Sequence, residues 1–86
     1  MSRKKILHIL TKEDHFPLDV ITRMAQSHQI TVVLTQDAIN LYMPEMDADS
    51  FILSEDPNLP RQIVYPRIDY NTLLTMIFES DSVIAW

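Results

Sequence analysis

The 86-residue sequence contains no cysteine and no glycine, and each absence argues against a class of chemistry. Without cysteine there is no disulfide, no thiolate nucleophile and no thiolate ligand for zinc or an iron–sulfur cluster. Without glycine there is no glycine-rich loop to bring backbone amides close to a phosphate, which argues against Rossmann-type and P-loop nucleotide binding. The chain on its own can therefore carry no sulfur-based reaction step.

Basic residues and long apolar runs are also scarce. Seven Lys and Arg residues stand against twelve Asp and Glu residues, and the formal net charge is −5. This balance argues against a nucleic-acid surface or an anionic-membrane surface, because both need clustered cations. No apolar run approaches the ~20 residues that span a bilayer, and the apolar stretch after the basic start is too short for a secretory leader. We expect a cytoplasmic protein that binds neither nucleic acid nor membrane.

Short aliphatic or β-branched runs recur along the chain and predict strands. Three segments have helical spacing. The first begins near Pro17, the second is a short helix over Gln36–Tyr42, and Asp69 caps the third, whose apolar positions run from Tyr70 to Phe78. The predicted strands are Lys5–Leu10, Ile30–Leu34, Phe51–Leu53, Gln62–Tyr65 and Ser82–Trp86.

The alternation of strands and helices predicts one α/β domain over residues 1–86. We expect three layers in a flavodoxin-like arrangement, with a mostly parallel five-stranded sheet and about three helices. Five strands spaced ~4.8 Å apart form a sheet roughly 20 Å wide, whereas one helix covers about 10 Å. Covering both faces would need at least four helices, so an apolar face is expected to remain open and the chain to form oligomers.

Polar residues at strand ends are the candidate ligand sites. Gln36 and Asp37 follow a strand and open a helix, which is where open α/β sheets bind ligands; alternatively, Asp37 only stabilises the helix start. The adjacent carboxylates Glu55 and Asp56 follow another strand, where they would serve as acid and base or bind a metal, or would simply be solvated. Taken alone, the residues favour the structural alternative in both cases.

Histidines and apolar surface residues complete the candidates. His8 lies inside an apolar strand, where a buried structural role is the more frequent one. No His-x-x-x-His pair is present, and we predict no metal site and no cofactor. Methionine and aromatic residues are enriched at protein interfaces, and here they either form an interface or close the core. The interface candidates are Tyr42, Met43, Met46 and Trp86.

Four segments, in order along nearly the whole chain, resemble the TusB/DsrH family of sulfur-relay proteins. Ile6–Leu10 resembles the family's Leu-His-Thr-Leu start, and Val33–Ile39 is similar to its Leu-Leu-Gln-Asp-Gly-Val segment, with Ala38 in place of glycine. Leu53–Asp56 resembles an Asn-Glu-Asp element. Ile68–Tyr70, followed by a helix and a final Ala-Trp, resembles the family's ending.

The resemblance implies a DsrE-like fold and a hetero-oligomer of related small subunits that passes persulfide sulfur between proteins, for wobble 2-thiouridine synthesis in tRNA or for sulfur oxidation. In the sulfur-carrying sister subunits the reactive cysteine lies near the end of the third strand, and the matching residues here are Leu53–Glu55, with Ser54 and no thiol. The resemblance thus implies a non-catalytic subunit, with sister subunits that carry the cysteine as its partners. A rival hypothesis is a homo-oligomeric DsrE-fold module, unrelated to sulfur transfer, that binds a small ligand or a protein.

Overall fold

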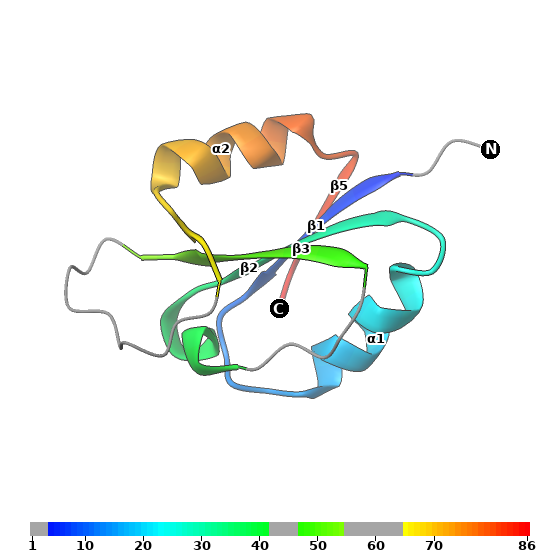
Figure 1. Ribbon diagram of the computed structural model, residues 1–86, viewed down its shortest axis with the longest axis horizontal. Coiled ribbons are helices and arrows are strands. Elements are labelled where there is room, and N and C mark those ends of the chain that lie inside the picture. The colour runs from blue at the N-terminus through cyan, green and yellow to red at the C-terminus, as the bar shows by residue number, and fades with distance from the viewer. Residues whose placement is uncertain (1–3, 42–46, 55–64) are drawn as a thin grey trace.

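Five parallel strands form one sheet in the computed structural model, which describes residues 4–41, 47–54 and 65–86 (Figure 1). The strands lie in the order β4-β3-β2-β1-β5, and every neighbouring pair is parallel. The predicted α/β class is confirmed, and the sheet is wholly rather than mostly parallel. The strands are β1 (Lys5–Leu10), β2 (Gln29–Leu34), β3 (Ala48–Leu53), β4 (Arg67–Ile68) and β5 (Ser82–Ala85).

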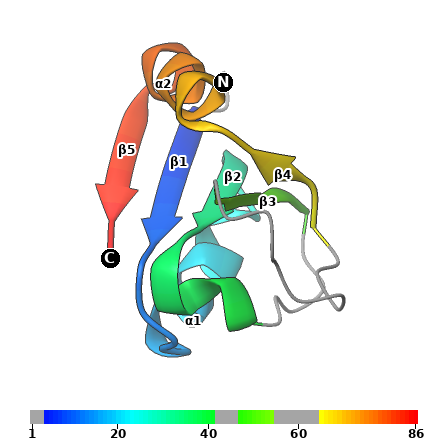
Figure 2. The ribbon, with the colours of Figure 1, turned by 90° about the vertical axis from the view of Figure 1, so that its left-hand side faces the viewer.

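Two α-helices cover the sheet, one on each face (Figure 2). They are α1 (Phe16–Met24) and α2 (Tyr70–Glu79). The prediction of about three helices is corrected to two within the described residues, because the segment expected as a short helix forms only a five-residue 3₁₀ turn, η1 (Gln36–Asn40). Leu41 has already returned to extended backbone, and one turn is too short to sustain an α-helix.

The face covered by α1 holds the larger part of the core. Pro17 suits the first turn of α1, where its missing N–H leaves no bond unmade, and Leu18 and Ile21 point into the core. Ile21 is 0% exposed. The buried residues of this cluster are Ile6, Leu10, Leu18, Ile21, Ala25, Ile30, Val32, Leu34, Ala38, Leu41 and Ile52.

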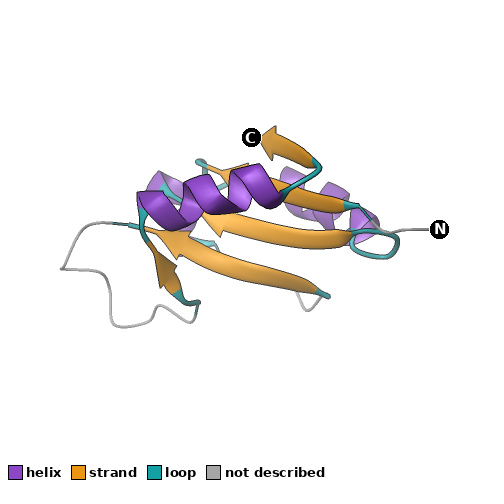
Figure 3. Ribbon diagram, turned by 90° about the horizontal axis from the view of Figure 1, so that it is seen from above, coloured by secondary structure: helices purple, strands orange, loops and turns teal. Residues whose placement is uncertain are grey.

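The face covered by α2 is packed less completely. The Asp69 side chain caps the helix by accepting a 2.8 Å hydrogen bond from the backbone N–H of Thr72, as predicted for an N-cap. Leu73, Met76 and Ile77 pack against the sheet, yet no described residue of α2 is fully buried. Seen from above, the helix lies over the sheet and β5 extends beyond it (Figure 3).

The apolar stripe of α2 is wider than its contact with the sheet. The predicted amphipathic helix is present, but three of its apolar residues, Tyr70, Leu74 and Phe78, are 57%, 52% and 85% exposed. The reason is that one helix on a five-stranded sheet touches it along a single line, so apolar residues on its flank remain in contact with water.

Two strands differ from their predicted bounds. β3 begins at Ala48, three residues before the predicted start, because pairing with β2 draws polar residues into the strand. The predicted strand Gln62–Tyr65 lies outside the described residues except for Tyr65, which is in a bend. Pro66 immediately precedes β4. Its carbonyl oxygen accepts a 2.8 Å bond from Ile52 N, since proline lacks only the donor.

The unequal packing of the two helices can be tested with matched truncations. Ile21→Ala in α1 should lower the free energy of unfolding by about 2–5 kcal/mol, because it opens a cavity in the core. Leu74→Ala in α2 removes the same number of carbon atoms and should cost about 1 kcal/mol or less. Urea unfolding of the isolated chain measures both, and equal losses would contradict the exposure of Leu74.

Candidate functional site

The carboxyl ends of the parallel strands meet at one edge of the sheet, where open α/β folds bind ligands. Leu10 of β1 pairs with Leu34 of β2, and Leu34 pairs with Ile52 of β3. The residues that follow these strands therefore lie side by side along this edge. Gln36 and Asp37 follow β2 and Ser54 follows β3, so all three lie at this edge in two separate loops. Their role in binding a ligand stays a prediction.

Gln36 is the residue that turns the chain at this edge. Its φ of 55° lies in the left-handed region, and Gln36 is the only described residue with a positive φ. Such a conformation is strained for a residue with a Cβ atom. The preceding Thr35 is held by a 3.0 Å bond from its N–H to Leu10 O. The side chains of Gln36 and Asp37 are both exposed to solvent.

Ser54 is half-buried directly after β3. The neighbouring carboxylates Glu55 and Asp56 lie outside the described residues, and their predicted role as an acid–base or metal pair is untested. The interface candidates Tyr42, Met43 and Met46 also lie outside the described residues.

His8 and Trp86 form an aromatic cluster at the same end of the sheet. Trp86 Nε1 donates a 3.0 Å hydrogen bond to His8 Nδ1, and the two rings stack with centroids 6.1 Å apart. Phe16 meets the indole edge-on at 6.3 Å. The backbone of Trp86 is fixed as well, since its N–H donates to Ile9 O and its carbonyl accepts a 2.8 Å bond from Thr11 Oγ1. The sequence carries no sign of this pairing, because the two partners are 78 positions apart.

The hydrogen bond from Trp86 determines the tautomer of His8, and burial favours its neutral form. Because Nδ1 accepts a hydrogen bond, the neutral ring carries its proton on Nε2, and that nitrogen is buried without a hydrogen-bond partner. Burial lowers the pKa of His8 from its ordinary value of 6.5, because desolvation disfavours the charged form. The side chain is 0% exposed. His8 therefore acts as a neutral structural residue here and not as a solvent-facing base, and Trp86 makes its contacts within the chain.

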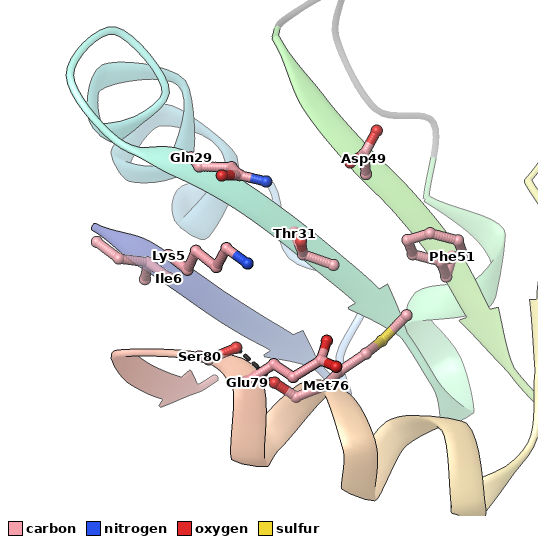
Figure 4. Close-up of a pocket in the computed structure, with 9 residues that line it drawn as sticks. All are labelled: Lys5, Ile6, Gln29, Thr31, Asp49, Phe51, Met76, Glu79 and Ser80. Carbon is pink, nitrogen blue, oxygen red and sulfur yellow. Dashed lines mark hydrogen bonds between the residues drawn. The ribbon is translucent and has the colours of Figure 1, made fainter. Parts of the chain in front are cut away.

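A pocket of about 210 Å³ opens at the opposite end of the sheet, between α2 and the first residues of β1, β2 and β3 (Figure 4). The side chains of Lys5 and Glu79 point toward it. It is smaller than the ~300–1,000 Å³ typical of ligand sites, and the Ser80 hydroxyl is engaged by Met76 O at 2.6 Å. No residue of this pocket was predicted, because its lining comes from short, separated segments without a motif. Its lining is Lys5, Ile6, Gln29, Thr31, Asp49, Phe51, Met76, Glu79 and Ser80.

Within the described residues, no three His, Asp or Glu side chains gather as a metal site would require. No described helix is both long and apolar enough to cross a membrane. The chain matches no protein-family model and no curated protein. Only the chain's own residues therefore bear on its function.

The buried neutral His8 predicts a pH dependence of stability. The unfolded chain takes up a proton near pH 6.5, whereas the folded chain resists it to lower pH. The free energy of unfolding should therefore fall as pH drops below about 6.5, by at most about 1.4 kcal/mol per pH unit for this one proton. His8→Asn should remove that contribution, whereas His15→Asn, the same change at an exposed position, should leave it. Urea unfolding of both variants from about pH 5 to pH 8, the range in which histidine titrates, measures this pH dependence. If the free energy of unfolding of His8→Asn varied with pH as much as that of the native chain, the buried neutral state of His8 would be refuted.

The left-handed residue gives a second prediction. Gln36→Gly should raise the free energy of unfolding by up to about 1 kcal/mol, because glycine adopts positive φ without a steric penalty. Ala38→Gly, the position at which the resembling family has its glycine, should instead lower it by about 1 kcal/mol, because Ala38 is buried and does not have a positive φ. Chemical denaturation compares the two, and a gain at position 38 would contradict the observed turn.

Proposed function

We propose that this chain is a non-catalytic subunit of a sulfur-relay hetero-oligomer of the TusBCD/DsrEFH type. In this role it supports the transfer of persulfide sulfur, either toward 2-thiouridine at the tRNA wobble position or within sulfur oxidation. The observation that carries the proposal is the serine at the end of β3. Ser54 directly follows β3, within the Leu53–Glu55 region that the resemblance matches to the cysteine of the sulfur-carrying subunits, and the sequence has no cysteine.

The chemistry assigns the transfer step to a partner. Sulfane sulfur is accepted and released by a nucleophilic thiolate, through thiol–disulfide-type exchange. A serine hydroxyl cannot replace it. If the chain takes part in a relay, the reacting sulfur belongs to another subunit, and this chain contributes surface and position.

The packing of the sheet supports the requirement for a partner. α2 leaves Tyr70, Leu74 and Phe78 exposed, and Val83 of β5 is 41% exposed although its strand neighbour Leu7 is buried. A domain of this size buries only about 60–65% of its unfolded surface and is marginal alone. Exposed apolar patches mark interaction surfaces in soluble proteins, and α2 and β5 together expose four large apolar side chains.

One observation favours the rival hypothesis of a homo-oligomeric binding module. The strained backbone of Gln36 lies beside Asp37 at the ligand-binding edge of the sheet, and such strain is concentrated at functional sites. This arrangement is compatible with a small ligand held near Asp37 and requires no sulfur chemistry.

Native mass spectrometry of the protein purified from its own host separates the two functions. The affinity tag belongs at the amino end, because Trp86 near the other end packs against His8. The relay proposal expects the chain to arrive with related small subunits, at least one of which has a reactive cysteine. Arrival as a homo-oligomer alone would overturn it.

A persulfide assay on the same complex tests the division of labour. After incubation with glutathione persulfide, a partner subunit should gain the mass of a sulfur atom and this chain should gain none. Prior alkylation with iodoacetamide is the control and should abolish the gain. Partners that take up no sulfur under these conditions would contradict the relay even if the complex exists.

A further inference from the structure

The α2 face of the sheet is apolar toward the carboxyl ends of its strands and polar toward the amino ends. Leu7 of β1, Val33 of β2 and Leu53 of β3 form the buried cluster under α2. Side chains alternate between the two faces along a strand, so the residues two and four positions earlier share this face. These earlier residues are Lys5, Gln29, Thr31, Asp49 and Phe51. All except Phe51 are polar, whereas the strands of a covered parallel sheet are normally apolar throughout.

The register of the strands places these polar side chains next to one another. Lys5 pairs with Gln29, and Thr31 pairs with Asp49. Together they form the floor of the pocket of about 210 Å³ described above, and the last turn of α2 forms one of its walls (Figure 4). The pocket is therefore built from three strands and a helix and not from a single loop.

Two opposite charges enter this pocket from different sides. The Lys5 ammonium group comes from β1, and the Glu79 carboxylate comes from the end of α2 (Figure 4). No ion pair joins the two or links either of them to another described residue. Asp81 lies close to the backbone of Lys5, but its carboxylate accepts the Lys5 N–H and does not line the pocket. Both charges are therefore available to a ligand that carries one charge of each sign.

The end of α2 strengthens the negative side of the pocket. The carbonyl groups at a helix C-terminus carry a partial negative charge, and Glu79 is the last residue of α2. Asp49 lines the same pocket from β3. A cationic group is thus favoured between α2 and β3, and an anionic group is favoured beside Lys5 on β1.

The apolar lining and the volume limit the kind of molecule that fits. Phe51 and Met76 line the side of the pocket opposite Lys5 (Figure 4). A cavity of about 150 Å³ takes up benzene. A volume of about 210 Å³ therefore accommodates a compact molecule with a short apolar side chain but not a nucleotide.

We propose that this pocket binds a free α-amino acid with an apolar side chain. The carboxylate of the amino acid pairs with Lys5, and its ammonium group pairs with Glu79. Its side chain packs on Phe51 and Met76. The site lies at the end of the sheet opposite the carboxyl edge and requires neither sulfur transfer nor a partner chain, so it goes beyond the proposed function.

An NMR titration of the full chain labelled with ¹⁵N tests the site with three probes. They are L-leucine, N-acetyl-L-leucine, which has no ammonium group, and L-leucinamide, which has no carboxylate. L-Leucine should bind saturably in about the millimolar range, as expected for so small a ligand, with amide shifts confined to the first residues of β1, β2 and β3 and the end of α2. Each analogue should bind about tenfold more weakly or worse, because it loses one charge-assisted contact. Absence of saturation by L-leucine, or equal affinity for either analogue, would overturn the proposal.

Matched variants separate the pocket from general charge effects. Lys5→Met and Glu79→Gln each remove one charge from the pocket and keep the length of the side chain, and each should weaken L-leucine binding by about tenfold or more. Lys12→Met and Glu13→Gln make the same changes at exposed residues beyond the other end of β1 and should leave the affinity within about twofold. The ¹⁵N spectrum of each variant reports whether it is folded. Native affinity in either pocket variant, or an equal loss in the control variants, would refute the site.

Discussion

β1 is paired on both sides, with β2 and β5, and the remaining layers of the protein depend on these two pairings. Leu7 and His8 are 0% exposed on opposite faces of this strand, so both cores meet at β1. The last strand and α2 join the rest of the domain mainly through it. A buried parallel strand needs continuous apolar sequence, and Ile6–Leu10 meets this need with one exception. The exception, His8, is accommodated by Trp86, whose indole N–H satisfies one ring nitrogen.

The two faces of the sheet are packed to different extents. The α1 face is closed by a helix with buried leucine and isoleucine and by the His8–Trp86–Phe16 cluster at its edge. The α2 face is covered by a helix with no fully buried residue among those described. The α1 face therefore holds most of the buried apolar core, and the α2 face leaves large apolar side chains exposed.

Much of this architecture could be predicted because it is local. The aliphatic run of β1, the Asp69 cap and the spacing in the last helix each depend on neighbours in sequence, and all three appear in the structure. The exposure of Phe78 could not be predicted, because it depends on how many helices cover the sheet. The His8–Trp86 hydrogen bond and the pocket near Lys5 also could not, since each unites residues from distant segments. The left-handed conformation of Gln36 also could not be predicted, because a glutamine does not indicate a positive φ, whereas a glycine at this position would have indicated one.

The pairing of β5 with β1 also has a consequence for how the chain is made. Lys5 and Asp81 are 76 positions apart, so one side of β1 stays uncovered until the residues of β5 are available to pair with it. Contacts of such long sequence separation form slowly, and an uncovered strand in a nascent chain is a hazard for aggregation. The parallel pairing that completes this sheet is therefore among the most non-local contacts of the domain, and β1 keeps one unpaired side until β5 has been made.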